Sequence, residues 1–282
     1  MWSRPRDPTI HGFVDIEVSE TLALIDQARR QRGLKLTMTH VVTQAVARAF
    51  AEHPELNAKV GLGGRILQRE TVDVFVSVAT DGGRDLTGVR LDEADALSLE
   101  QIAAGVAERV ESTRKDEDPT YRRSRDLMRR LPSPLLRPML WLTDVLTNEL
   151  HLHLPAASMP RDPFGSVVVT NVGMFGIDTA FAPFVPLARC PMLLLVTAVR
   201  ERPWVVKRPD GSSAVEPRPV LRLCATFDHR IVDGAAAGRL AESIVRWVES
   251  PLGGTSATND RQGEEARDVD LRHVHRARRA RA

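Results

Sequence analysis

The chain has 282 residues, of which 43% are hydrophobic and 27% are charged, so it can bury a sizeable core without disulfide or metal staples. This balance excludes a chain that is disordered throughout, a collagen-like fibre and a cysteine-rich secreted scaffold. Lysine and arginine number 39 against 37 acidic residues, and this small excess gives no indication of a nucleic-acid partner.

The cysteines and the start of the chain bear on its cellular setting. Cys190 and Cys224 are too few for a disulfide framework, which is typical of a reducing compartment. The first residues lead into a pattern with strand character and contain no secretory signal. The longest apolar run, 191–199, is too short to span a bilayer. We therefore expect a cytoplasmic protein.

Hydrophobic periodicity predicts an alternation of strands and helices in the first part of the chain. Every second residue is apolar over 13–18 and 71–79, which predicts two half-buried strands. Helical spacing predicts a helix over 22–32, which Gly33 ends, and a second one that Thr39 caps and that ends at Pro54. A Ser98–Gln101 capping box begins a third helix.

Residues 118–163 interrupt this rhythm with basic residues beside an apolar, proline-containing stretch. One interpretation is a helix at a membrane surface, through Leu135–Leu146. The other, which we favour, is a helical insertion that caps the core or packs against another subunit. His151 and His153 are spaced for one face of a strand, but no cysteine or carboxylate cluster accompanies them, so we expect no metal.

The remainder of the chain returns to regular structure. A helix follows Gly234 and ends at Pro251, and the polar, basic residues 253–282 are expected to be a disordered tail. Because the order of elements mixes hairpins with crossovers, we expect an α/β (α+β) fold with a mixed sheet, in one domain over 1–252. Three further strands are predicted, at 166–170, 192–199 and 221–227, with a hairpin turn at 209–212.

The segment Thr226–Ala235 carries the most informative side chains. His229 lies between a strand and a helix, on a connection of the kind that often positions catalytic groups. An unperturbed imidazole titrates near pH ~6.5 and is suited to removing a proton from a thiol or hydroxyl. Asp233 can orient the loop, and Gly234 can allow a tight turn into the helix. This spacing also arises by chance, so the motif alone is compatible with an ordinary loop histidine.

Two segments together resemble a known family. Asp-His-Arg-Ile-Val-Asp-Gly-Ala at 228–235 resembles the signature of the catalytic domain of 2-oxo acid dehydrogenase E2 acyltransferases, relatives of chloramphenicol acetyltransferase. Val-Thr-Asn-Val-Gly-Met-Phe-Gly at 169–176 is similar to the second signature of that family. The similarity covers about 7–251 in order, except the segment 118–163. It implies a chloramphenicol acetyltransferase-like fold, a mixed sheet flanked by helices, and CoA-dependent acyl transfer.

The resemblance implies a role for each matching residue. His229 matches the general base, which deprotonates a thiol or hydroxyl acceptor for direct attack on an acyl thioester. Thr170 matches the hydroxyl that donates a hydrogen bond to the tetrahedral oxyanion, and Asp233 matches a residue that holds the loop in shape. The positions implied to bind substrate are Asn171, Gly173, Thr226 and Gly234.

The resemblance also implies partners. In the family the site lies between neighbouring subunits of a trimer, so we expect a homotrimer or a higher assembly with acyl-CoA as substrate. We expect no lipoyl or subunit-binding domain in this chain, so that lipoyl groups would arrive on a lipoyl-domain or acyl-carrier protein. Residues 83–89 depart from the family pattern, which leaves the acceptor open.

Two functions therefore compete. The first is a dihydrolipoamide acyltransferase-like enzyme, and the second is a non-catalytic trimeric scaffold of the same fold. The presence of His229, Thr170 and Asp233 together favours the enzyme, because drift in a scaffold would erode some of them.

Overall fold

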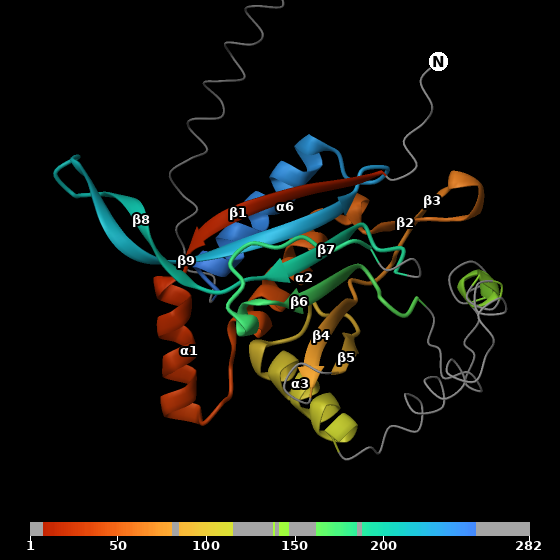
Figure 1. Cartoon of the computed structure of the whole chain (residues 1–282), viewed down its shortest axis with the longest axis horizontal. Helices are drawn as coiled ribbons and strands as arrows, with labels where there is room; N and C mark the ends of the chain where they lie inside the picture. Colours follow the sequence, from red (N-terminus) through yellow and green to blue (C-terminus); the bar gives the residue numbers. More distant parts are fainter. Residues whose placement is uncertain are drawn as a thin grey trace, which may run out of the picture. The chain divides into compact units, whose positions relative to one another are not determined.

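A mixed β-sheet forms the centre of the part of the chain that the structure describes (Figure 1). The computed structural model describes residues 8–80, 85–114, 138, 141–146, 162–184 and 188–251. Its strands follow the order β1-β9-β7-β6-β4-β5, and β8 pairs with the outer part of β9. The sheet consists of β1 (Thr9–Glu17), β4 (Val74–Thr80), β5 (Asp85–Leu91), β6 (Val167–Asn171), β7 (Met192–Val196), β8 (Arg200–Lys207) and β9 (Ser213–Asp228).

The strand directions confirm the expected mixed sheet. β6 runs parallel to both β4 and β7, whereas the β1–β9, β7–β9, β8–β9 and β4–β5 pairs are antiparallel. A separate two-stranded sheet pairs β2 (Ala58–Val60) with β3 (Ile66–Gln68). The helices are α1 (Ser19–Arg32), α2 (Met38–Glu52), α3 (Leu99–Arg114) and α6 (Gly234–Glu249).

The sheet separates two apolar layers because successive side chains of a strand point to opposite faces. On one face, side chains of β1, β4, β6, β7 and β9 pack against α2, α3 and α6 (Figure 1). On the other face, Val168, Leu195 and Cys224 contact the segment that follows β6, through residues such as Ala180 and Phe184. Large, fully buried members of the first layer are Phe50, Ile102, Met192, Leu194, Leu221, Leu223 and Leu240.

Several local predictions are confirmed by the structure. Gly33 ends α1 in the left-handed region, at φ 63°. Ser98 and Gln101 form the reciprocal capping box: the Ser98 N–H donates to Gln101 Oε1 at 2.8 Å, and the Gln101 N–H donates to Ser98 Oγ at 3.2 Å. The predicted turn at 209–212 connects β8 and β9, with Gly211 at φ 81°.

Some strands begin earlier in the structure than predicted, because pairing with a neighbouring strand sets where they begin. β1 begins at Thr9, before the predicted start, because its ladder with β9 already begins at the Thr9–Asp228 pair. β9 extends back to Ser213 because β8 supplies a second partner for its outer half. The prediction that Thr39 caps the second helix is wrong, since Thr37 occupies that position and Thr39 lies inside the first turn of α2.

The predicted insertion and tail fall largely outside the described residues. Of 118–163, the structure describes only 138, 141–146 and 162–163, and none of 253–282 is included. His151 and His153 are likewise outside. Within the described ranges, no helix has both the length and the apolar composition needed to cross a bilayer.

Candidate active site

His229 lies on the connection from β9 to α6. Its side chain is exposed, and its backbone N–H donates to the Pro8 carbonyl at 2.9 Å. The ring Nδ1 lies 3.0 Å from the Val232 carbonyl oxygen. Because a carbonyl oxygen only accepts hydrogen bonds, Nδ1 carries a hydrogen, and in the neutral ring Nε2 then keeps a lone pair. The imidazole is therefore held in the tautomer that can accept a proton through Nε2.

An ion pair holds the first turn of this connection. Asp228 is buried at the end of β9, and its carboxylate accepts from Arg230 Nε at 2.9 Å and from the Arg230 backbone N–H at 3.0 Å. The hydrogen bond to Asp228 raises the pKa of Arg230 above its usual value. The Asp228 carbonyl also accepts the N–H groups of Ile231 and Val232, both at 2.9 Å. This turn brings the Val232 carbonyl back to the ring of His229.

Asp233 is the N-cap of α6. Its side chain accepts the Ala236 N–H at 2.8 Å, and its φ of −84° and ψ of 178° are extended. The carboxylate thus satisfies a donor that the helix cannot. This position supports the predicted loop-shaping role, while its part in a reaction remains a prediction. The expectation that Gly234 permits a tight turn is wrong, because its φ is not positive and an added Cβ would meet nothing within 4 Å.

Thr170 and Asn171 end β6 at the start of a tight turn. Thr170 is half-buried and has the same strand parity as Val168, so it faces the layer away from the helices. Asn171 Nδ2 donates to Thr39 Oγ1 at 2.7 Å, and its Oδ1 accepts the Met174 N–H at 3.2 Å. The amide therefore ties this turn to the first turn of α2.

Gly173 is required by close packing of this turn. A Cβ built on it would lie 2.4 Å from both the carbonyl carbon and the oxygen of Thr197. No larger residue fits there without movement of one of the two backbones. Thr226, the remaining predicted substrate-binding residue, is buried, donates to the Ala182 carbonyl at 2.9 Å and contacts His11 Nδ1 at 3.0 Å.

The strand register places Thr170 and His229 at opposite ends of the sheet. Thr170 pairs with Leu195, and Leu195 pairs with Cys224 on β9. Asp228 ends β9 four residues farther on, about 14 Å along the strand, and His229 follows it. β6 and β9 are also separated by β7. One copy of the chain therefore does not bring these two predicted catalytic side chains together.

Two groups that orient this site were absent from the sequence-based prediction. The Val232 carbonyl sets the His229 tautomer, and Thr39 anchors Asn171. No sequence pattern marks a backbone carbonyl as a partner of a ring nitrogen. The sequence indicates Thr39 only as a helix cap, since a contact over 132 positions leaves no local signal.

A separate polar cavity lies beside β3 and β4 and has a volume of about 490 Å³. Asp162 there accepts from Arg69 Nε at 2.6 Å and from Lys59 Nζ at 3.4 Å. Burial lowers the pKa of Lys59. Burial alone would raise the pKa of Asp162, but the positive charges and hydrogen bonds of Arg69 and Lys59 bring the pKa of Asp162 below its usual value. These charges compensate one another. Among the side chains that the structure describes, no group of three or more His, Cys, Asp or Glu is placed to hold a metal ion.

Comparison with known proteins adds a family match. The family model described as 2-oxoacid dehydrogenases acyltransferase (catalytic domain) matches residues 3–118 and 163–253. The acetyltransferase component of the pyruvate dehydrogenase complex of Zymomonas mobilis is 24% identical over 254 residues, which are 89% of this chain and 47% of that protein. A probable succinyltransferase component of the 2-oxoglutarate dehydrogenase complex of Schizosaccharomyces pombe is 23% identical, over 88% of this chain and 46% of the relative. The chain thus spans about half the length of the curated relatives it matches.

Solved structures share the fold. A probable dihydrolipoamide acetyltransferase from Listeria monocytogenes superposes with a TM-score of 0.64 at 21% identity, over 90% of this chain and 89% of that chain. The cubic core of the pyruvate dehydrogenase multienzyme complex superposes with a TM-score of 0.63 at 22% identity, over 87% and 83% of the two chains. At this identity the likeness establishes the arrangement of helices and strands.

Proposed function

Because the chain belongs to the family of 2-oxoacid dehydrogenase acyltransferase catalytic domains, we propose that it is a CoA-dependent acyltransferase. The acyl group moves from a thioester to a thiol or hydroxyl acceptor in one direct attack. The observation that carries this proposal is the exposed His229 imidazole, whose Nδ1–H is occupied by the Val232 carbonyl at 3.0 Å. Relatives named as acetyltransferase and succinyltransferase components support the reaction class.

In the proposed mechanism, His229 Nε2 takes the proton of the acceptor as its sulfur or oxygen attacks the thioester carbon. The resulting imidazolium keeps its Nδ1–H bond to the Val232 carbonyl, whose dipole favours the positive charge. The Thr170 hydroxyl donates to the oxyanion of the tetrahedral intermediate, where a preorganised donor contributes about 3 kcal/mol. Collapse of the intermediate breaks the bond to the CoA sulfur, which receives the proton from His229.

The proposed mechanism requires more than one copy of the chain. Because the register separates Thr170 from His229, we propose that Thr170 of one copy serves His229 of a neighbouring copy in a homotrimer. Exposed apolar side chains near the face that carries Thr170 support such an interface. Among the described residues they are Phe13, Met174, Phe175, Ile177 and Phe181, each between 40% and 58% exposed.

The proposed acceptor is a dihydrolipoyl group carried by a lipoyl domain. The relatives named as dihydrolipoyllysine-residue transferase components support a lipoyl thiol, and the exposed position of His229 is compatible with delivery by a separate domain. The scaffold alternative keeps the same assembly without turnover.

The test is release of free CoA from acetyl-CoA and longer acyl-CoAs, with and without dihydrolipoamide. Acceptor-dependent release should fall about 10²–10⁴-fold in His229→Ala, as loss of a general base predicts. Arg239→Ala changes an exposed residue of α6 and is the control: it should release CoA at the wild-type rate.

CoA release that does not depend on the acceptor and is the same in the wild type and in His229→Ala would contradict the proposal. If no release occurs, CoA binding decides: tight binding means that a different acceptor is required, and absence of binding favours the scaffold.

A further inference from the structure

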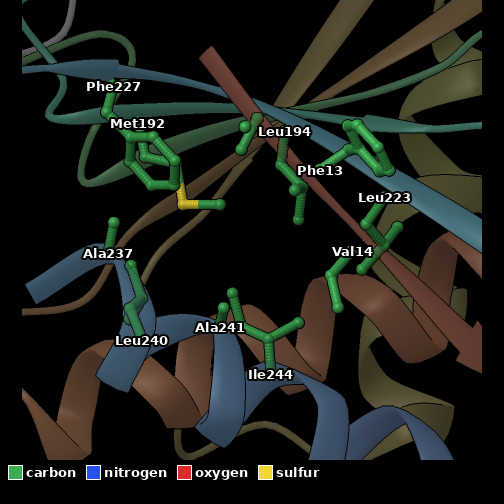
Figure 2. Close-up of a pocket in the computed structure, with 12 residues that line it drawn as sticks. Phe13, Val14, Met192, Leu194, Leu223, Phe227, Ala237, Leu240, Ala241 and Ile244 are labelled. Carbon is green, nitrogen blue, oxygen red and sulfur yellow. The ribbon is translucent and has the colours of Figure 1, made fainter. Parts of the chain in front are cut away.

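An apolar cavity of about 180 Å³ lies between the sheet and α6. Figure 2 shows Val14, Met192, Leu194, Leu223 and Phe227 on the side of the sheet and side chains of α6 on the other, facing a common space. The Phe13 ring lies on the opposite face of β1, against Arg222. The deepest residues are almost fully buried, with Met192 at 1%, Leu194 at 2% and Leu240 at 0% exposure. All 12 lining residues are glycine or carry apolar side chains: Gly12, Phe13, Val14, Met192, Leu194, Leu223, Ala225, Phe227, Ala237, Leu240, Ala241 and Ile244.

Small residues form the entrance of this cavity. Gly12 on β1, an edge strand of the sheet, and Ala237 and Ala241 on α6 are partly exposed, whereas the residues behind them are buried. A Cβ on Gly12 would meet only Phe227 Cε2, at 3.9 Å, so the space beside this glycine is open. The cavity is therefore accessible from the sheet edge.

One end of the cavity is lined by the two residues that flank the connection carrying His229, Phe227 and Ala237. Phe227 and Ala237 face each other at one end of it, from β9 and α6 (Figure 2). Phe227 precedes His229 by two residues, and Ala237 lies in the first turn of α6. The chain must cross this end of the cavity between β9 and α6, and His229 lies on that crossing. Because Ala237 belongs both to this end and to the entrance, an apolar tail on a molecule that reacts beside the imidazole would enter the cavity here.

We infer that this cavity binds the aliphatic chain of the transferred acyl group, an inference that rests on the proposed acyl transfer. An apolar cavity of ~150 Å³ stays dry and binds benzene, a six-carbon ligand, so this volume suits an unbranched chain of about four to six carbons. No polar side chain in the lining would favour the carboxylate of a dicarboxylic acyl group. The substrate class is a short, uncharged aliphatic acyl thioester.

Calorimetric titration of the 282-residue chain with CoA, acetyl-CoA, butyryl-CoA and hexanoyl-CoA tests the inference. Burial of each methylene contributes ~0.8 kcal/mol, so wild-type affinity should rise roughly tenfold for every two carbons up to six. Gly12→Val fills the open space and should abolish this rise while leaving CoA and acetyl-CoA affinity unchanged. Gly238→Val makes the same change on α6, where an added Cβ meets nothing within 4 Å, and should behave as wild type.

The outcomes separate this inference from the proposed function. A tenfold rise that persists in Gly12→Val would overturn the cavity as the chain-binding site. Equal affinity for acetyl-CoA and hexanoyl-CoA in the wild type, with turnover that depends on His229, would overturn the inference and leave the acyltransferase intact. Failure of every CoA compound to bind to the wild type would overturn both the inference and the proposed function. Retained binding of acetyl-CoA to Gly12→Val shows that this variant is folded.

Discussion

At the scale of single residues, backbone proximity constrains the candidate site as strongly as its chemistry does. Gly173 follows Thr170 by three positions and packs against the backbone of Thr197, which leaves no room for a Cβ. Asn171 lies between them, and its side-chain amide forms one hydrogen bond within this turn and one to α2. The position of the Thr170 hydroxyl therefore depends on a glycine that has no chemical function of its own.

Gly173→Ala should lower the free energy of unfolding by about 1–3 kcal/mol, because a Cβ at 2.4 Å from Thr197 forces the backbone to move. Urea denaturation measures the change. Gly238→Ala is the matched control: it lies in α6 with open space around it and should stabilise the protein by about 0.5–1 kcal/mol. Equal stability of Gly173→Ala and the wild type would show that the turn has more freedom than the contacts indicate.

At the scale of elements, the first turn of α6 forms one end of the loop that holds His229. Asp233 accepts the Ala236 N–H through its side chain and the Ala237 N–H, at 2.8 Å, through its carbonyl. The other end is fixed by the Asp228–Arg230 pair. A change at Asp233 should therefore act on the reaction by displacing the loop and not by removing a proton carrier.

Asp233→Ala should cost about 1 kcal/mol of stability and reduce acyl transfer, whereas Asp233→Asn should retain most of both. Asparagine caps helices about as well as aspartate but cannot take a proton. Thermal unfolding and the kcat for CoA release, measured on both variants, separate the two roles. An Asn variant that is fully stable yet as inactive as the Ala variant would establish a proton-transfer role instead.

The N-terminus of α2 contains a buried histidine. His40 Nδ1 accepts the Thr37 N–H at 3.3 Å, and burial lowers the pKa of His40 to about 4. In the unfolded chain a histidine takes up its proton near pH ~6.5. Between these two values the unfolded state binds more protons, so stability decreases as the pH falls from 6.5 toward 4 and does not depend on this group above 6.5.

The wild type should lose up to ~3 kcal/mol of unfolding free energy from this group between pH 7 and pH 4. His40→Gln keeps an acceptor at the same position of the helix and cannot titrate, so its loss over that range should be smaller by this amount. Denaturation at both pH values, compared between the two proteins, isolates the histidine from the carboxylates. Equal pH dependence would mean that His40 takes up its proton over the same pH range in the folded and unfolded states.

Local elements were predictable from the sequence where the signal is itself local. The Ser98–Gln101 capping box lies within one turn of helix, and the structure contains it. The cap of α2 was not predictable in the same way, because Thr37 and Thr39 are both suitable residues. The choice depends on His40, which binds the Thr37 N–H, and on the distant Asn171, which binds Thr39.

At the scale of the whole molecule, the candidate residues were identified from two short motifs, but their arrangement was not. His229 and Thr170 were expected to act on one substrate, and no sequence pattern gives the distance between two strand ends. That distance follows from the order β9-β7-β6 and from the registers of both pairs. The separation it produces agrees with the expected site between subunits and provides a direct test of it.

Two inactive variants should restore activity to each other if the site combines two copies. His229→Ala keeps Thr170, and Thr170→Ala keeps His229; random mixing in a cyclic trimer leaves about a quarter of the sites with both groups intact. Co-expressed variants should therefore show roughly 25% of wild-type acyl transfer, although Thr170→Ala alone retains only about 10⁻²–10⁻³ of it. A site within one chain gives no such recovery, because every copy then lacks one group. Separately purified variants, assayed together without exchange of subunits, are the control.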